Sequence, residues 1–509
     1  MTFATKGPTF VTGLGVLAVA VLSGPAAAQP ADTLRVGNWD FPPGRGNPYS
    51  TVSAGVPQVY VWPAMFDAVT AIDGKGTANP LLATAWKNID PVTWTITLRP
   101  NVKFHNGETL TANTVTTIFD WFKSDAGKAS VAAQQMTFVA SARAVDAMTV
   151  EIKTTTPRPV LPNLLAQLYL VPEKAWAELG PEKFVTAPLG SGSYRTVAWT
   201  NEVVRMEAFK DAWRPAKTPK LEVLRLAEQA SRLQALVSNQ IDIMIDSRAD
   251  ETAQIKAVGG RVETAPSPAL MHLAYVLENV KAGVDNTMLK DKRVRHALNY
   301  AVNKQAINES LLGGGWTLST QFTVPSAFGY NPDLQPWPYD PVKAKALLAE
   351  AGYPNGFTLK GEVRDFFDIW GQVTLDLAKV GIKLELSNVV QADWLRKFLA
   401  TTWEGPSFGL ALGFGPEMDA ARVAFFQSCR KNPPHYCNRE LMPLLDAIDA
   451  EFDVAKRRAM LHDLMARMRE DAPALMLFEQ VDFFGVGKRV RDFKSVNRIF
   501  NFHEITLAN

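Results

Sequence analysis

The sequence has few cysteines, no excess of either charge and no basic tract of the kind that binds nucleic acid. Its 509 residues include two cysteines, Cys429 and Cys437, which are too few for a cysteine-rich zinc site or an iron–sulfur cluster. The 53 Lys and Arg residues nearly cancel the 51 Asp and Glu residues, which leaves a net charge of +2. A protein that binds polyanions through bulk electrostatics has a clear basic excess, so we expect no nucleic-acid partner.

Motifs of catalysis are also missing. The chain has no Gly-x-Ser-x-Gly elbow, no Walker loop and, beyond its first residues, no Gly-x-Gly-x-x-Gly segment after a strand. No two of the six histidines have the spacing of a helical metal pair; they are His105, His272, His296, His435, His462 and His503. These absences favour a binding protein over an enzyme, and we expect neither a cofactor nor a metal site.

The first 28 residues have the three parts of a secretory signal peptide. Lys6 is the only charged residue before Asp32, an apolar run covers residues 10–22, and an alanine triplet occupies residues 26–28. A membrane anchor is the alternative, but the run is shorter than the ~20 residues that cross a bilayer. We expect export with cleavage after Ala28, and no lipid anchor because no cysteine lies near that position.

Export changes how the two cysteines are interpreted. Cys429 and Cys437 lie eight positions apart, and in an oxidising compartment such a pair can form a disulfide. The residues between them include Pro433 and Pro434, which are typical of a loop. Two buried free thiols are one alternative, and a metal held together with His435 is another, although this would have few ligands. We expect the disulfide.

Strand and helix patterns alternate along the chain, which indicates an α/β or α+β fold. Residues 93–98 alternate between the two faces of a half-buried strand. Asp291 and Asp340 each precede an apolar helical pattern and are placed to cap it. A further amphipathic helix is predicted over residues 453–471, before Pro473. The length suggests about three domains.

Six segments, in the same order along the chain, resemble one protein family. One of them is Leu98-Arg-Pro-Asn-Val-Lys-Phe-His-Asn-Gly-Glu-Thr-Leu-Thr-Ala112, which combines a strand, a tight Asn-Gly turn and the start of a helix. The others are residues 80–86, 188–194, 236–243, 292–301 and 340–357. Together they resemble the extracellular solute-binding proteins, family 5, the dipeptide-, oligopeptide- and nickel-type receptors of ABC importers. Ser193 stands where that family usually has a proline.

The resemblance implies an α/β, two-lobed periplasmic binding protein fold (type II, cluster C-like) with an extra subdomain. Two crossovers, near residues 272 and 477, would form the hinge. The parts expected in chain order are a signal peptide (1–28), lobe I (29–66), a subdomain packed on lobe I (67–188), lobe I again (189–272), lobe II (273–477) and the C-terminal part of lobe I (478–509).

The resemblance also indicates where a ligand would bind. In peptide-binding relatives, an aspartate shortly after a Gly-Trp pair holds the ammonium group of the ligand, because an unpaired buried charge is costly. The corresponding segment here is 410–419. Phe414 lies near the expected tryptophan, and Glu417 and Asp419 straddle the aspartate position. The alternative is that these acids are solvated loop charges.

Three further residues are candidates for the ligand cleft. Trp394 falls where relatives place an aromatic side chain against the ligand, and Gln480 falls where peptide binders carry a tyrosine near the hinge. Trp39 follows the first predicted strand. Packing in the core is the alternative for both tryptophans. An amide at position 480 would favour hydrogen bonding over stacking.

The leading hypothesis is a periplasmic receptor whose lobes close on a small solute, a peptide or peptide-like molecule. It would deliver the solute to the permease subunits of an ABC importer at the inner membrane, act as a monomer and catalyse no reaction. The alternatives are a non-peptide solute (an opine, an oligosaccharide, an aromatic conjugate or a metal chelate), an exported hydrolase, or a chaperone or sensor. Segment 410–419 departs from the family pattern, so the resemblance does not identify the solute.

Overall fold

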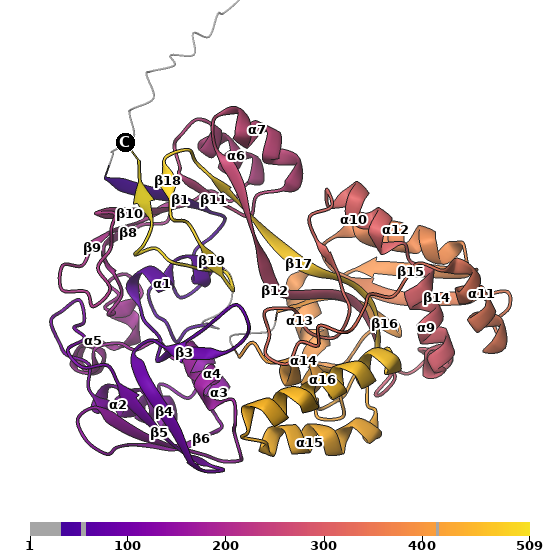
Figure 1. Cartoon of the computed structure of the whole chain (residues 1–509), viewed down its shortest axis with the longest axis horizontal. Helices are drawn as coiled ribbons and strands as arrows, with labels where there is room; N and C mark the ends of the chain where they lie inside the picture. Colours follow the sequence, from indigo (N-terminus) through magenta and orange to yellow (C-terminus); the bar gives the residue numbers. More distant parts are fainter. Residues whose placement is uncertain (1–31, 52–56, 414–416, 509) are drawn as a thin grey trace, which may run out of the picture.

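Two bodies joined by a pair of long strands make up the molecule (Figure 1). The computed structural model describes residues 32–51, 57–413 and 417–508, so the expected signal peptide and Phe414 lie outside the described residues. The connecting strands are β12 (Arg261–Tyr275) and β17 (Ala474–Val486). Within these three ranges, no helix has the length and apolar character needed to cross a membrane.

One sheet extends through both bodies. Its strand order is β15-β14-β16-β12-β17-β11-β1-β10-β9-β8, and β13 (Thr317–Leu318) pairs with β17. β12 and β17 are antiparallel partners over almost their whole length, with register shifts between Pro266 and Leu270 and between Met271 and His272. Because both strands pass from one body to the other, bending of this pair would move the bodies against each other.

Lobe I has a parallel centre. Leu34 and Val36 of its first strand are fully buried, as expected for a strand that is covered on both faces. β1 runs parallel to β10 on one side and to β11 on the other. The elements of this lobe are β1 (Thr33–Asn38), α1 (Trp62–Met65), β8 (Tyr194–Trp199), β9 (Val203–Ala208), β10 (Lys220–Arg225), β11 (Ile243–Ile245), α6 (Gln229–Val237), α7 (Thr252–Ala257) and the short C-terminal strands β18 (Val490–Arg491), β19 (Ser495–Val496), β20 (Ile499–Phe500) and β21 (Thr506–Leu507).

A subdomain with its own four-stranded sheet packs on lobe I. The strand predicted over residues 93–98 is confirmed as β5, whose Trp94, Ile96 and Leu98 are buried. One continuous apolar cluster contains both Ile96 of the subdomain and Val36 of lobe I, so the two parts share a core. The elements are β2 (Thr70–Ile72), β3 (Ala78–Pro80), β4 (Ala83–Asp90), β5 (Thr93–Leu98), β6 (Val139–Ala144), β7 (Thr149–Thr154), α2 (Ala112–Lys123), α3 (Val131–Gln135), α4 (Leu161–Leu164) and α5 (Glu173–Phe184).

Lobe II is built on three further strands with cores of its own. β14 lies between β15 and β16 and runs parallel to both. Asp291 and Asp340 cap α9 and α11 as predicted, by accepting hydrogen bonds from the backbone of Arg293 and Lys343. The elements are β14 (Phe357–Val363), β15 (Ile382–Asn388), β16 (Ser407–Gly413), α8 (Thr287–Lys290), α9 (Lys292–Ala301), α10 (Lys304–Leu311), α11 (Pro341–Glu350), α12 (Phe367–Ala378), α13 (Gln391–Ala400), α14 (Ala420–Phe426), α15 (Met442–Ala450) and α16 (Val454–Asp471).

The predicted disulfide between Cys429 and Cys437 is present and closes the loop after α14. His435, inside this loop, is fully buried, and its ring lies against those of Phe398 and Phe408. Burial lowers the pKa of His435 to about 3, so the imidazole is neutral. With both thiols oxidised, the alternative of a metal bound by these cysteines and His435 is wrong.

Candidate functional site

Each lobe has an edge at which parallel strands end, and ligands of open α/β sheets bind outside such carboxyl ends. In lobe I, Trp39 follows β1 and Asp246 follows β11. Because Gly37 pairs with Met244 in the parallel register, the two residues are at the same level on neighbouring strands. In lobe II, Arg364 follows β14, and the loop that contains Glu417 follows the neighbouring strand β16.

The edge of lobe I presents an acid with a perturbed pKa. The side chain of Asp246 is 71% exposed, and yet desolvation by the surrounding protein raises its pKa. The guanidinium of Arg232 lies 3.6 Å from the carboxylate, and its charge offsets only part of this rise in pKa. Trp39, at the same level on β1, is half-buried, and its predicted role in the cleft stays a prediction.

In lobe II, Glu417 has a carboxylate oxygen that no hydrogen bond engages within the described residues. It is 9% exposed, and its Oε1 lies 3.3 Å from a guanidinium nitrogen of Arg422. Its Oε2 is buried and has no hydrogen-bond partner in the described part of the chain. Burial raises the pKa of Glu417, because the charged form loses hydration that a single ion pair does not replace. A cationic group next to Oε2 would stabilise the carboxylate.

Asp419 is in a different situation, although it lies only two residues away. Its two carboxylate oxygens are 2.6 and 3.0 Å from the guanidinium of Arg457 on α16, and Oδ1 also accepts the backbone N–H of Ala421 at the start of α14. Both partners of the ion pair are buried. The carboxylate of Asp419 is thus engaged within the protein, so in the proposal below the ligand is assigned to Glu417.

Trp394 contacts the core of lobe II and a cation at the same time. Its ring is stacked on Phe398 with a centroid distance of 5.2 Å, and its indole N–H donates to the carbonyl of Gly409 at 3.3 Å. The guanidinium of Arg364 lies over the same ring, 5.5 Å from the centroid. Trp394 is half-buried and packs against the core of lobe II, and it also holds a cation at the strand edge. Its predicted contact with the ligand stays a prediction.

The loop after β14 was not identified from the sequence. Arg364 pairs with Asp365 at 2.7 Å, and Asp365 and Phe366 both have left-handed backbones, with φ of 61° and 55°. Two consecutive non-glycine residues in this region are strained, and such strain collects at functional loops. Phe366 also contacts Trp316, with ring centroids 5.7 Å apart. The available signal was the position of these residues directly after the alternating run 357–363.

Gln480 lies on β17, in the segment that connects the lobes, and is 9% exposed. Its neighbour Glu479 is 2% exposed and has no cation partner in the described residues, and burial raises its pKa to about 8. Asp482, two residues further, is paired with Arg498 at 2.8 and 2.9 Å, and Arg498 also donates to Ser267 of β12. The hinge strands therefore carry polar groups at the border of the lobes, and a role of Gln480 in binding stays a prediction.

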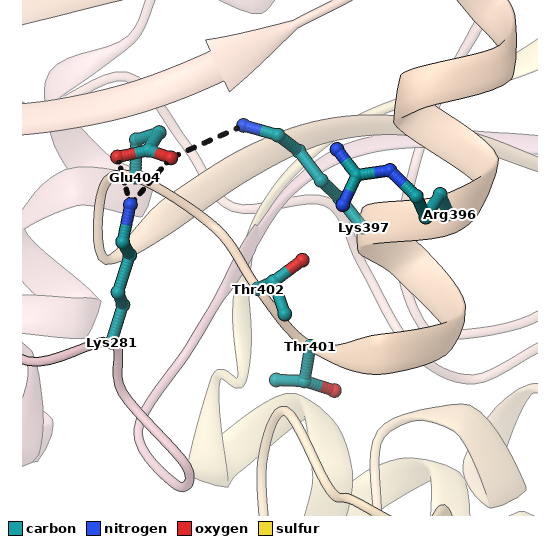
Figure 2. A pocket seen from close by; sticks show the side chains of 6 residues that line it. All are labelled: Lys281, Arg396, Lys397, Thr401, Thr402 and Glu404. Atoms are coloured by element: carbon teal, nitrogen blue, oxygen red, sulfur yellow. Dashed lines mark hydrogen bonds and ion pairs between the residues drawn. The ribbon is translucent and has the colours of Figure 1, made fainter.

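One cavity lies elsewhere, in lobe II, and its lysines are paired with acids. It has a volume of about 260 Å³, and we call it the lysine cavity; Figure 2 shows its lining residues Lys281, Arg396, Lys397, Thr401, Thr402 and Glu404. Lys281 binds both oxygens of Glu404 at 2.6 and 2.7 Å. Lys397 pairs with the buried Glu362 and lies 3.7 Å from Glu404. No unpaired lysine in this cavity is available to a ligand.

A second cavity, of about 170 Å³, lies between the subdomain and lobe II. We call it the subdomain cavity. The subdomain contributes Gly76, Thr77, Ala78, Trp86, Trp94, Pro159, Val160, Pro162 and Asn163, and lobe II contributes Phe328, Asp419, Phe452, Val454 and Arg457. The segment that contains Glu417 and Asp419, which we call the acid loop, therefore borders the subdomain. The structure places Trp39 and Asp246 at the same level on neighbouring strands of lobe I and brings Trp394 next to Arg364 in lobe II. It also joins the backbone of Glu417 to the subdomain through Asn163.

Comparison with known proteins gives a family match over most of the chain. The family described as bacterial extracellular solute-binding proteins, family 5 Middle, matches residues 77–425. The matched segment includes Arg364, Trp394 and Glu417.

Individual relatives agree with this match. The glutathione-binding protein GsiB of Pectobacterium atrosepticum is 30% identical over 275 residues, which are 53% of this chain and 52% of that protein, so the chain matches about half of that relative's length. The dipeptide-binding protein of Escherichia coli K12 is 26% identical over 468 residues, 82% of this chain and 84% of that protein. The solved structure of HbpA2 from Haemophilus parasuis has the same two-lobed fold, with a TM-score of 0.81 and 22% identity over 94% of this chain and 100% of that chain.

Proposed function

Because this chain belongs to the bacterial extracellular solute-binding proteins, family 5, we propose that it is the periplasmic receptor of an ABC importer for a small zwitterionic peptide. The observation that carries this proposal is the buried Oε2 of Glu417, which has no hydrogen-bond partner in the described residues. A ligand ammonium would fill this position. Arg364, at the end of the neighbouring strand, would bind the ligand carboxylate, since guanidinium and carboxylate groups match in geometry.

The names of two relatives support a small peptide as the solute. One is named for glutathione and the other for dipeptides, and both solutes carry a free ammonium and at least one carboxylate. The half-buried Trp394 beside Arg364 would contact the apolar part of such a ligand. The non-peptide solutes considered above are outcomes of the test that follows.

Binding would act through closure of the two lobes. A solute that contacts Glu417 in lobe II and the Trp39 and Asp246 edge of lobe I binds the closed form more tightly than the open form. The β12 and β17 pair would bend, because it is the connection that runs through both bodies. The closed surface would then be recognised by the permease subunits.

The remaining parts of the proposal concern location and chemistry. The leader of residues 1–28 would direct export, with cleavage after Ala28. The mature protein would act in the periplasm as a monomer and would release its solute chemically unchanged. An exported hydrolase is the competing function, and turnover of ester or peptide substrates above background would favour it.

Calorimetric titration tests the zwitterion directly. Reduced glutathione and dialanine are the probes, and N-acetyl-dialanine and dialanine amide are matched controls that lack one charge each. We expect a free peptide to bind in the micromolar range, about −8 kcal/mol. Each blocked peptide should bind at least about 100-fold more weakly, because a buried charge is left unpaired. Equal binding of blocked and free peptides would remove Glu417 and Arg364 from the site.

Native mass spectrometry of the purified protein would detect a co-purified solute and so test the other solute classes. A co-purified peptide would support the proposal. A co-purified opine, oligosaccharide, aromatic conjugate or metal chelate would keep the receptor function and replace the peptide with that solute.

A further inference from the structure

The turn between β2 and β3 of the subdomain meets the backbone of lobe II. Gly76 in this turn is buried and has a left-handed φ of 72°. A Cβ atom at this position would overlap the backbone nitrogen of Phe328 and the backbone oxygen of Met418. These two lobe II atoms are hydrogen-bonded to each other at 2.7 Å. Only a glycine allows the turn to come this close.

Asn163 of α4 links the same turn to the acid loop. Its side-chain amide donates to the carbonyl of Gly76 and to the carbonyl of Glu417, both at 2.7 Å. An asparagine amide has two N–H donors, and here one holds the turn while the other crosses to lobe II. The bond to Glu417 therefore connects the subdomain to the residue that we assign to the ligand ammonium.

The contact lies between lobe II and the subdomain, which would move with lobe I when the two lobes close. The subdomain shares its apolar core with lobe I, whereas the buried residues of the principal lobe II cores come from lobe II and from the β12 and β17 pair, with Ile72 of the subdomain packed against one of them. Figure 1 shows α4 and β3 on the side of the N-terminal body that faces α14, α15 and α16. Beside the contact lies the subdomain cavity, and Trp94 and Phe452 meet there with ring centroids 6.0 Å apart. The subdomain and lobe II therefore meet through a surface that encloses a cavity.

We propose that Gly76 and Asn163 form a latch, which closes on the backbone of Phe328, Glu417 and Met418 and positions Glu417 from outside the ligand pocket. This inference deepens the proposed function and rests on it. Contacts present only in the closed form shift the population toward closure. The latch would therefore raise solute affinity although neither Gly76 nor Asn163 touches the solute, so both are positioning residues.

Crosslinking in the ligand-free protein measures the latch without any assumption about the solute. Thr77 is exposed, Val454 is 63% exposed, and both line the subdomain cavity from opposite sides. A Thr77→Cys/Val454→Cys pair, treated with a short bismaleimide, should crosslink when the latch is closed, and the native cysteines are already bonded to each other. In this background, Gly76→Ala should slow crosslinking about tenfold, since overpacking of this kind disfavours the closed form.

Two glycines provide matched controls. Gly74 lies in the same turn, and Gly107 has a left-handed φ of 89°; a Cβ at either position would meet no atom within 4 Å. Gly74→Ala should crosslink at the parent rate, and Gly107→Ala separates the effect of backbone strain from the loss of the contact. Asn163→Asp, which places a carboxylate against two carbonyl oxygens, should slow crosslinking as Gly76→Ala does and keeps the test open if Gly76→Ala does not fold.

Titration with reduced glutathione then separates the two proposals. The affinity of Gly76→Ala should fall at least by the same factor as its crosslinking rate, because the closed population falls and Glu417 is no longer held in position. An unchanged crosslinking rate in both Gly76→Ala and Asn163→Asp would overturn the latch, and so would a parent pair that does not crosslink above background. If glutathione binds to none of the proteins, glutathione is excluded as the solute, while the crosslinking rates still decide the latch.

Discussion

Two charged regions of this protein differ in how their charges are compensated. In the lysine cavity, Lys281 is paired with Glu404 and Lys397 with Glu362. Between the lobes, Glu417 has a buried oxygen without a partner, and Glu479 has no cation partner, within the described part of the chain. The lysine cavity is thus electrostatically complete. The comparison indicates that uncompensated polar groups, more than the presence of a cavity, mark the place where a charged ligand would bind.

The largest effect is expected where a buried charge pair supports the fold. Asp419→Ala would leave Arg457, which is 5% exposed, without its carboxylate partner. Loss of one partner of a buried pair costs about 3–5 kcal/mol, so the free energy of unfolding should fall by that amount. Chemical denaturation measures it, and Asp419→Ala/Arg457→Met, which removes both charges, should recover most of the loss. A single variant as stable as the parent would show that this pair contributes little.

Glu417→Gln should have the opposite profile, because its open oxygen contributes to binding and not to folding. We expect dialanine to bind at least about 100-fold more weakly, since its ammonium loses the carboxylate. The melting temperature should stay the same or rise, because a poorly compensated buried charge is removed. Glu404→Gln in the lysine cavity is the matched control and should leave binding unchanged. Full binding by Glu417→Gln would place the ammonium elsewhere.

The uncompensated Glu479 should make the stability of the protein depend on pH. Its pKa rises from an ordinary value of 4.5 to about 8 on burial, so the folded state holds the proton more tightly than the unfolded state. The cost of ionising Glu479 is therefore absent below about pH 4.5, grows as the pH rises and is complete above about pH 8. Glu479→Gln should melt several degrees higher than the parent at pH 8 and at a similar temperature at pH 5. Calorimetry at both pH values measures this, and equal melting temperatures at pH 8 would contradict it.

The smallest effect is expected in the lysine cavity. Lys281 is about half exposed, and exposed ion pairs contribute less than about 1 kcal/mol. Lys281→Ala should therefore change neither the stability measurably nor the affinity for dialanine. A clear loss of affinity would mean that the lysine cavity takes part in binding, which would contradict the distinction between the two charged regions.

Much of the fold could be predicted from local patterns. The strand at residues 93–98, the caps at Asp291 and Asp340, and the helix that is now α16 depend on neighbours within a few positions, and the structure confirms them. The disulfide followed from two cysteines with no other cysteine to pair with. The lobe boundaries stay a prediction, because lobes are defined by contacts between distant segments.

The candidate site was predicted less completely, for a physical reason. Arg364 was missed because its importance comes from Trp394, which lies 30 positions later and meets it only through the neighbouring strands β14 and β15. Asn163 was missed because its partner Glu417 is 254 positions away. No spacing along the chain encodes either contact.

The sequence by itself determined the family, the alternation of strands and helices, the cysteine pair and the segment that carries the two acids, since each depends on residue types and their order. Only the tertiary structure decided which acid is available. Asp419 forms an ion pair with Arg457, 38 residues further along the chain, whereas Glu417 has one oxygen without a partner in the described residues. The physical reason is that the availability of a buried charge depends on the groups that folding brings within a few ångströms of it.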